Sequence, residues 1–125
     1  MIKFIHTRYK VSDIERSVAF YEKLGFTVVE PLRKSPQGND IIFMGLPGND
    51  HKLEFTCTKD MIPTVPEDLV HVALGVPDII SYCDDLEKKG ISIWPDGWRE
   101  KFKTGLKMAF VTDPDGYEVE ILERR

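Results

Sequence analysis

The sequence predicts one α+β domain made of two successive modules, each with the strand and helix order β-α-β-β-β. Three observations support this prediction: a length of 125 residues, an internal repeat, and apolar patterns that switch between strand and helix spacing. We expect the first module over about residues 1–58, a connector over about 59–68 and the second module over about 69–125. The helices should cover one face of each sheet and leave the other face free to curve around a site.

The internal repeat appears in two blocks of aligned sequence. Residues 5–26, IHTRYKVSDIERSVAFYEKLGF, match residues 70–91, VHVALGVPDIISYCDDLEKKGI, at an offset of 65. The match resumes at an offset of 66 between FMGLPGNDHKLEF and AFVTDPDGYEVEI. The first block predicts strand, helix, glycine stop and strand in each copy, and the second predicts a hairpin around the turns PGND and DPDG.

Each copy contains one short amphipathic helix. In the first copy Ser12 and Glu15 form a capping-box pattern, and Gly25 marks the helix end. In the second copy Pro77 suits the first helical position, and Gly90 marks the end. Apolar residues at helical spacing lie between these signals: Ile14, Val18, Tyr21 and Leu24, then Ile79, Cys83 and Leu86.

Composition narrows the class of protein. Hydrophobic residues make up 42% and charged residues 30%, which is the balance of a globular protein, and no apolar run approaches the ~20 residues of a membrane span. A formal charge of −4 disfavours nonspecific binding to nucleic acid. The N-terminus does not resemble a signal peptide, so we expect a cytoplasmic protein. Cys57 and Cys83 are expected to be reduced core thiols.

Two histidines and two glutamates occupy equivalent positions of the repeat. His6 and His71 are separated by the offset of 65, and Glu54 and Glu120 by the offset of 66. Strand alternation places all four on the less apolar face, because their immediate neighbours are mostly apolar. The alternative is four solvated strand residues. The third histidine, His51, follows the PGND turn and is expected to be exposed and inert.

The predicted site has two imidazoles and two carboxylates. This donor set suits Ni²⁺, Co²⁺, Zn²⁺, Mn²⁺ or Fe²⁺, and four protein ligands leave two octahedral positions for water or substrate. Structural zinc sites usually employ thiolates and are closed. The sequence therefore predicts a catalytic site for one divalent metal ion at His6, Glu54, His71 and Glu120.

Four segments, HTRYKVSDIERSVAFYEKLGF, KLEFT, VHVALGV and DPDGYEVEIL, together resemble glyoxalase I of the vicinal oxygen chelate superfamily. The resemblance implies the glyoxalase/bleomycin-resistance/extradiol-dioxygenase fold and the same four metal ligands. Related extradiol dioxygenases and fosfomycin-inactivating thiol transferases use two histidines and one glutamate, and methylmalonyl-CoA epimerase has a glutamine at the second position. Glu54 therefore favours glyoxalase I, a lactoylglutathione lyase.

The resemblance also implies an activity, a metal and an assembly. Glyoxalase I isomerises the hemithioacetal of methylglyoxal and a thiol, usually glutathione, to the S-D-lactoyl thioester, and so detoxifies methylglyoxal. Glu120 is implied as the base, with Glu54 handling the proton on the other face. The short chain is similar to bacterial forms that prefer Ni²⁺ or Co²⁺ to Zn²⁺. Those forms are homodimers in which His6 and Glu54 of one chain would face the partner's His71 and Glu120.

Basic side chains near the predicted ligands are candidates for binding the thiol. Arg8 and Lys10 share a strand face with His6, while Lys101 and Lys103 precede the DPDG turn in an expected loop and strand. Solvated surface charge is the alternative for each of them.

Two substitutions leave the thiol open. Lys10 stands where bacterial glyoxalases have an arginine that contacts glutathione, and Thr58 stands where they have an asparagine. Another small thiol therefore remains an option. Of Trp94 and Trp98, we expect one to form a wall of the pocket.

Three other functions stay open from sequence. An epimerase or dioxygenase of the same fold would act on an acyl-CoA or a catechol. A drug-binding or resistance protein would bind no metal tightly. An interaction protein would tolerate alanine at all four candidate ligands.

Overall fold

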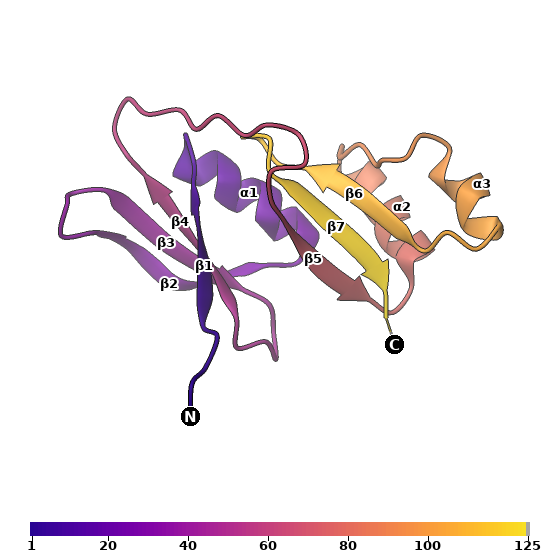
Figure 1. Ribbon diagram of the computed structural model, residues 1–125, viewed down its shortest axis with the longest axis horizontal. Coiled ribbons are helices and arrows are strands. Elements are labelled where there is room, and N and C mark those ends of the chain that lie inside the picture. Colours follow the sequence, from indigo (N-terminus) through magenta and orange to yellow (C-terminus); the bar gives the residue numbers. More distant parts are fainter. Residues whose placement is uncertain (125) are drawn as a thin grey trace. The chain divides into compact units, whose positions relative to one another are not determined.

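The computed structural model describes residues 1–124 and divides the chain into two compact units, unit 1 (Met1–Thr64) and unit 2 (Val65–Arg125). Both units combine helix with sheet, as Figure 1 shows, and the predicted α+β class is confirmed. None of the helices within residues 1–124 has the length and apolar character needed to cross a bilayer.

In unit 1 a helix covers one face of a four-stranded sheet. The elements are β1 (His6–Lys10), α1 (Ile14–Leu24), β2 (Thr27–Lys34), β3 (Asp40–Gly45) and β4 (Lys52–Cys57). The strand order is β1-β4-β3-β2, with β1 parallel to β4 and the other pairs antiparallel. Tyr21 of α1 packs on Phe55 of β4 with ring centroids 4.9 Å apart, and both side chains are fully buried. The predicted order β-α-β-β-β is observed in this half.

Unit 2 repeats the plan with a three-stranded sheet. Its elements are β5 (His71–Val76), α2 (Ile79–Lys88), α3 (Trp98–Lys103), β6 (Met108–Thr112) and β7 (Glu118–Glu123), with strand order β5-β7-β6. The strand expected after Gly90 is reduced to one bridge, in which Trp94 and Phe110 exchange two backbone hydrogen bonds of 2.9 Å. Pro95 follows and has no amide hydrogen to continue the ladder.

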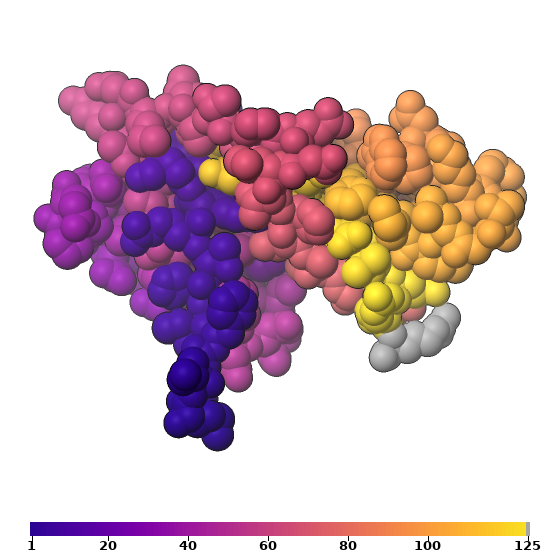
Figure 2. Space-filling model, viewed as in Figure 1, coloured from indigo at the N-terminus to yellow at the C-terminus, as the bar shows by residue number. Residues whose placement is uncertain are grey.

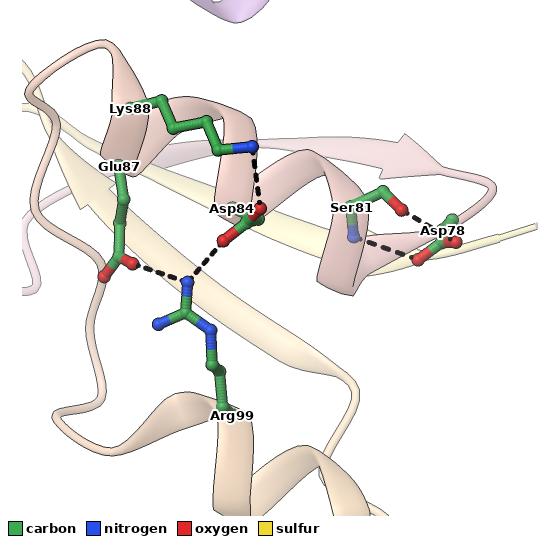
Figure 3. Close-up of polar contacts among 6 residues, drawn as sticks. All are labelled: Asp78, Ser81, Asp84, Glu87, Lys88 and Arg99. Atoms are coloured by element: carbon green, nitrogen blue, oxygen red, sulfur yellow. Dashed lines mark hydrogen bonds and ion pairs between the residues drawn. The ribbon is translucent and has the colours of Figure 1, made fainter.

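The helix starts differ from the sequence prediction by one or two residues. The N-cap of α1 is Asp13 rather than Ser12, because the Asp13 carboxylate accepts from the backbone N–H of Arg16 at 3.1 Å. The N-cap of α2 is Asp78, which accepts from Ser81 in the same way (Figure 3), so the proline before it lies outside the helix. Gly25 ends α1 as predicted, with φ of 116°.

The helix α3, which the sequence did not predict, packs against α2. Arg99 Nη2 lies 2.5 Å from Asp84 Oδ1 and 3.0 Å from Glu87 Oε1 (Figure 3), and Trp98 Nε1 donates to Glu87 Oε2 at 3.0 Å. The hydrogen bond from Arg99 lowers the pKa of Asp84 below its ordinary value. These contacts fix α3 on the helical side of unit 2.

The residues before β1 project from unit 1, as the indigo end of the chain in Figure 2 shows. Met1 and Ile2 are fully exposed, whereas Phe4 stacks on the ring of His51 with centroids 4.3 Å apart. His51 also contacts Thr7 Oγ1 through Nε2 at 2.9 Å and lies half-buried. The prediction that His51 is exposed and inert is therefore wrong in its first part, because this ring anchors the N-terminal segment.

The two cysteines are expected to differ sharply in reactivity. Cys83 of α2 is buried, and burial raises the pKa of its thiol to about 12, so at pH 8 almost none of it is thiolate. Cys57 is half-buried at the end of β4. Alkylation of the folded protein at pH 8 should label Cys57 first and Cys83 only after denaturant is added. Equal labelling rates would contradict this, and a Cys57→Ser variant identifies the fast thiol.

Candidate metal centre

The first candidate pair lies on the face of the unit 1 sheet that α1 does not cover. Tyr9 of β1 and Leu53 and Phe55 of β4 are each at most 3% exposed and point into the core. Alternation turns His6 and Glu54 to the opposite face, as the sequence predicts. Because β1 and β4 are neighbours in the sheet, the two side chains meet across one strand pair.

Glu54 is shared between His6 and Arg8. His6 Nε2 lies 3.9 Å from Glu54 Oε1, and Arg8 Nε donates to the same oxygen at 2.5 Å. Glu54 is only 4% exposed, so its carboxylate oxygens depend on these partners for polar contacts. The hydrogen bond to Glu54 raises the pKa of Arg8 above its ordinary value. This carboxylate is thus buried, paired with a permanent cation and fixed in orientation.

The second candidate pair has the same construction without the arginine. His71 of β5 and Glu120 of β7 lie on neighbouring parallel strands, and His71 Nε2 is 3.3 Å from Glu120 Oε1. Ala73 stands opposite Glu120, as Arg8 stands opposite Glu54. Within residues 1–124 the only ionic partner of Glu120 is therefore His71. The two carboxylates have equivalent positions but different electrostatic surroundings.

Each unit therefore presents one imidazole and one carboxylate, which we call the half-sites: His6 with Glu54, and His71 with Glu120. In both, the nitrogen nearest the carboxylate is Nε2, so one N and one O donor face the same space. This chemistry fits a divalent metal ion with borderline preference. No three His, Cys, Asp or Glu side chains gather within residues 1–124 in the manner of a metal site.

A phenylalanine contacts each candidate histidine, and the sequence did not single out either one. Phe43 of β3 meets His6 edge-on, with ring centroids 5.3 Å apart and an interplanar angle of 81°. Phe110 of β6 meets His71 at 5.7 Å and 88°. In the sheets Phe43 pairs with Glu54 and Phe110 with Glu120, so the two phenylalanines are structurally equivalent.

Two cavities lie next to the phenylalanines that contact the candidate histidines. One of about 290 Å³ in unit 1 is lined by residues that include His6 and Phe43. One of about 260 Å³ in unit 2 is walled by Trp94 and Phe110. Trp94 is 58% exposed and lines this second cavity, whereas Trp98 is 3% exposed. The remaining lining of the second cavity is polar or acidic: Glu67, Asp68, Thr112 and Glu118.

The predicted substrate contacts divide into two groups. Lys10 Nζ donates to Thr58 Oγ1 at 2.6 Å, so these two lie together beside Arg8 on the open face of unit 1. Lys101 and Lys103 lie on α3, where Lys103 pairs with Glu100 at 3.1 Å. The sequence predicted a loop and a strand at these lysines. That prediction is wrong, because both lysines lie on a helix that packs on α2.

The fold defines a class of two-module α+β protein, and comparison with known proteins gives its family. A family model for the glyoxalase/bleomycin resistance protein/dioxygenase superfamily matches residues 3–121. The chain belongs to this superfamily, which confirms the resemblance seen in the sequence.

Relatives within the superfamily include proteins named lactoylglutathione lyase and a solved glyoxalase I. A probable lactoylglutathione lyase of Synechocystis is 34% identical over 95% of this chain and 93% of its own length. The lactoylglutathione lyase of Haemophilus influenzae is 27% identical over 99% and 94%. Among solved structures, the trypanothione-dependent glyoxalase I of Leishmania major is 31% identical with a TM-score of 0.79, covering 98% of this chain and 87% of its own.

Proposed function

We propose that the protein is a metal-dependent glyoxalase I, which isomerises the hemithioacetal of methylglyoxal and a small thiol to the S-D-lactoyl thioester. The observation that carries this proposal is the matched pair of half-sites, His6 with Glu54 at 3.9 Å and His71 with Glu120 at 3.3 Å. Similarity to lactoylglutathione lyases supports the reaction class. The physiological role would be detoxification of methylglyoxal, and we propose that it takes place in the cytoplasm.

The four half-site residues would hold one divalent metal ion, with Ni²⁺ or Co²⁺ preferred to Zn²⁺. When bound, the metal would polarise the two substrate oxygens and so acidify the neighbouring C–H bond. Glutamate at position 54 or 120 would take the proton from the carbon that bears sulfur and return it to the adjacent carbonyl carbon. The reaction is then an isomerisation, since one C–H bond breaks and one forms with no net loss of atoms.

The difference between the two carboxylates supports Glu120 as the base. Glu54 is held by the 2.5 Å hydrogen bond from Arg8, and a carboxylate fixed in this way cannot readily turn toward a substrate carbon. Glu120 has Ala73 at the equivalent place and is 18% exposed in its side chain, against 5% for Glu54. Glu120 is therefore freer to leave one partner and approach a substrate carbon. Glu54 would stay a ligand or act on the proton at the other face.

We propose that a homodimer completes the site, with His6 and Glu54 of one chain and the partner's His71 and Glu120 around one metal ion. Support comes from the half-sites themselves, since each unit supplies two ligands and an octahedral metal needs more. The thiol is proposed to lie near Arg8, Lys10 and Thr58, which border the first half-site.

The proposal is tested by removing metal and restoring Ni²⁺, Co²⁺ or Zn²⁺ separately. Thioester formation from methylglyoxal is then followed by ultraviolet absorbance with several thiols. Glutathione alone is an insufficient probe, because Lys10 and Thr58 stand where the similar bacterial glyoxalases have an arginine and an asparagine that contact glutathione. Other small thiols therefore belong in the panel. We expect turnover only with added metal.

The outcome that would reject this function is no thioester with any metal and any thiol from a folded protein. Turnover of an acyl-CoA epimer or a catechol by the same reconstituted samples would assign another reaction of the superfamily. Metal-independent turnover would contradict the role of the half-sites.

A further inference from the structure

The two phenylalanines beside the histidines occupy one position of the repeated fold. Each lies on the strand antiparallel to the glutamate strand, pairs directly with the glutamate, and meets the histidine ring edge-on. The angles of 81° and 88° are both close to perpendicular, which is a preferred geometry for aromatic pairs. The same three-residue arrangement of histidine, glutamate and phenylalanine is therefore built twice.

Neither histidine has the hydrogen bond that usually orients a metal-binding imidazole. Such a ring normally donates its second nitrogen to a carboxylate or a carbonyl, which fixes both tautomer and ring orientation. In the described chain, the contacts of His6 and His71 within their own units are the carboxylate near Nε2 and the phenylalanine ring. Nδ1 of either ring thus has no protein acceptor in its own unit.

We propose that Phe43 and Phe110 are positioning residues, whose rings hold His6 and His71 with Nε2 directed at the glutamate and hence at the metal. The edge-on contact takes the place of the missing second-nitrogen hydrogen bond. This inference rests on the proposed metal site. It adds a function for two residues that would otherwise be ordinary strand phenylalanines.

The location of Phe110 separates this role from plain core packing. Its strand neighbours Ala109 and Val111 are at most 2% exposed and form the core, while Phe110 is half-buried on the opposite face. There its ring also meets the ring of Trp94, with centroids 5.8 Å apart. On this face the Phe110 ring contacts His71 and lines the cavity, and it is not part of the core.

The test is Phe110→Leu, with Phe102→Leu as its matched control. Phe102 is buried in the same unit and contacts Trp98 but not His71. Loss of the ring at 110 should weaken Co²⁺ binding about tenfold in competition with a chelator and change the visible Co²⁺ spectrum. The control should lower only thermal stability, and Phe110→Tyr, which keeps the ring, should restore both metal readouts.

The first half-site provides a second, independent comparison. Phe43→Leu should alter Co²⁺ affinity and spectrum as Phe110→Leu does, while Phe26→Leu, a buried control in the same unit, should not. Unchanged affinity and spectrum in both half-site variants would overturn the inference and leave the metal site itself intact. Absence of Co²⁺ binding by the wild-type protein would instead reject the proposed function. A spectral change in the control variants would show general core loosening and also overturn it.

Discussion

Glu120→Gln is expected to abolish most thioester formation while metal binding largely survives. Glutamine keeps the length of the side chain and one carbonyl oxygen for the metal, but it cannot accept a proton from carbon. Loss of a general base lowers turnover by at least about 100-fold. The effect should be larger than that of a change at Glu54, which Arg8 holds in an ion pair 2.5 Å long.

Two measurements make this prediction specific. Turnover is measured at saturating metal, and Ni²⁺ affinity is measured separately by competition with a chelator. Glu100→Gln is the control, because Glu100 lies on α3 of the same unit and, among residues 1–124, forms an ion pair only with Lys103 on the surface. Near-normal turnover of Glu120→Gln would remove Glu120 from the role of base. If the Glu120→Gln variant loses both turnover and Ni²⁺ affinity, Glu120 is a metal ligand and the base is unassigned.

His6→Ala and His71→Ala are each expected to be inactive alone and to restore activity when mixed. Each change removes one ligand from every site of a homodimer. If sites are shared between chains, a dimer of the two variants has one site with both histidines and one with neither. Random exchange of subunits should therefore return about a quarter of wild-type activity.

The mixing experiment separates two arrangements of the same ligands. If each chain instead completes its own site, every site in the mixture lacks one histidine and activity stays at the background of the single variants. The variants are denatured and refolded together, with each refolded alone as the control. Activity in a mixture that sediments as a monomer would contradict the proposed dimer.

The equivalent positions of the four residues in the two copies of the repeat predicted that each histidine pairs with a glutamate. His6 and His71 share one offset and Glu54 and Glu120 another, and strand alternation placed each of them on the less apolar face of its strand. Such a prediction works because strand periodicity and duplication both follow directly from residue spacing. It also gave the β-α-β-β-β order of unit 1.

The phenylalanines were missed because the two hairpins differ in length by one residue. Phe43 precedes its glutamate by 54 − 43 = 11 positions and Phe110 precedes its own by 120 − 110 = 10, as the strand registers show. The offset of 66 that aligns the glutamates therefore sets Phe43 against Ala109. Register across a hairpin depends on loop length, which a gapless alignment does not represent.

Local competition explains the other differences. Ser12 and Asp13 are both good caps, and the capping-box pattern selected the serine although the aspartate makes the bond to the Arg16 amide. In unit 2 the apolar pattern after Gly90 predicted a strand, but Pro95 interrupts the backbone ladder at Trp94. The helix α3, which carries Lys101 and Lys103, is held to α2 by the ion pair of Arg99 with Asp84, a tertiary contact that no local pattern contained.

The central claim, one metal ion held by both half-sites, is tested most directly by X-ray absorption spectroscopy of the Ni²⁺-loaded protein. We predict a six-coordinate ion with only N and O donors and a multiple-scattering signal from two imidazoles. His6→Ala and His71→Ala should each reduce that signal to one imidazole. A spectrum with sulfur ligands, or with two imidazoles that persist in both variants, would contradict the assignment of His6 and His71 to one shared metal.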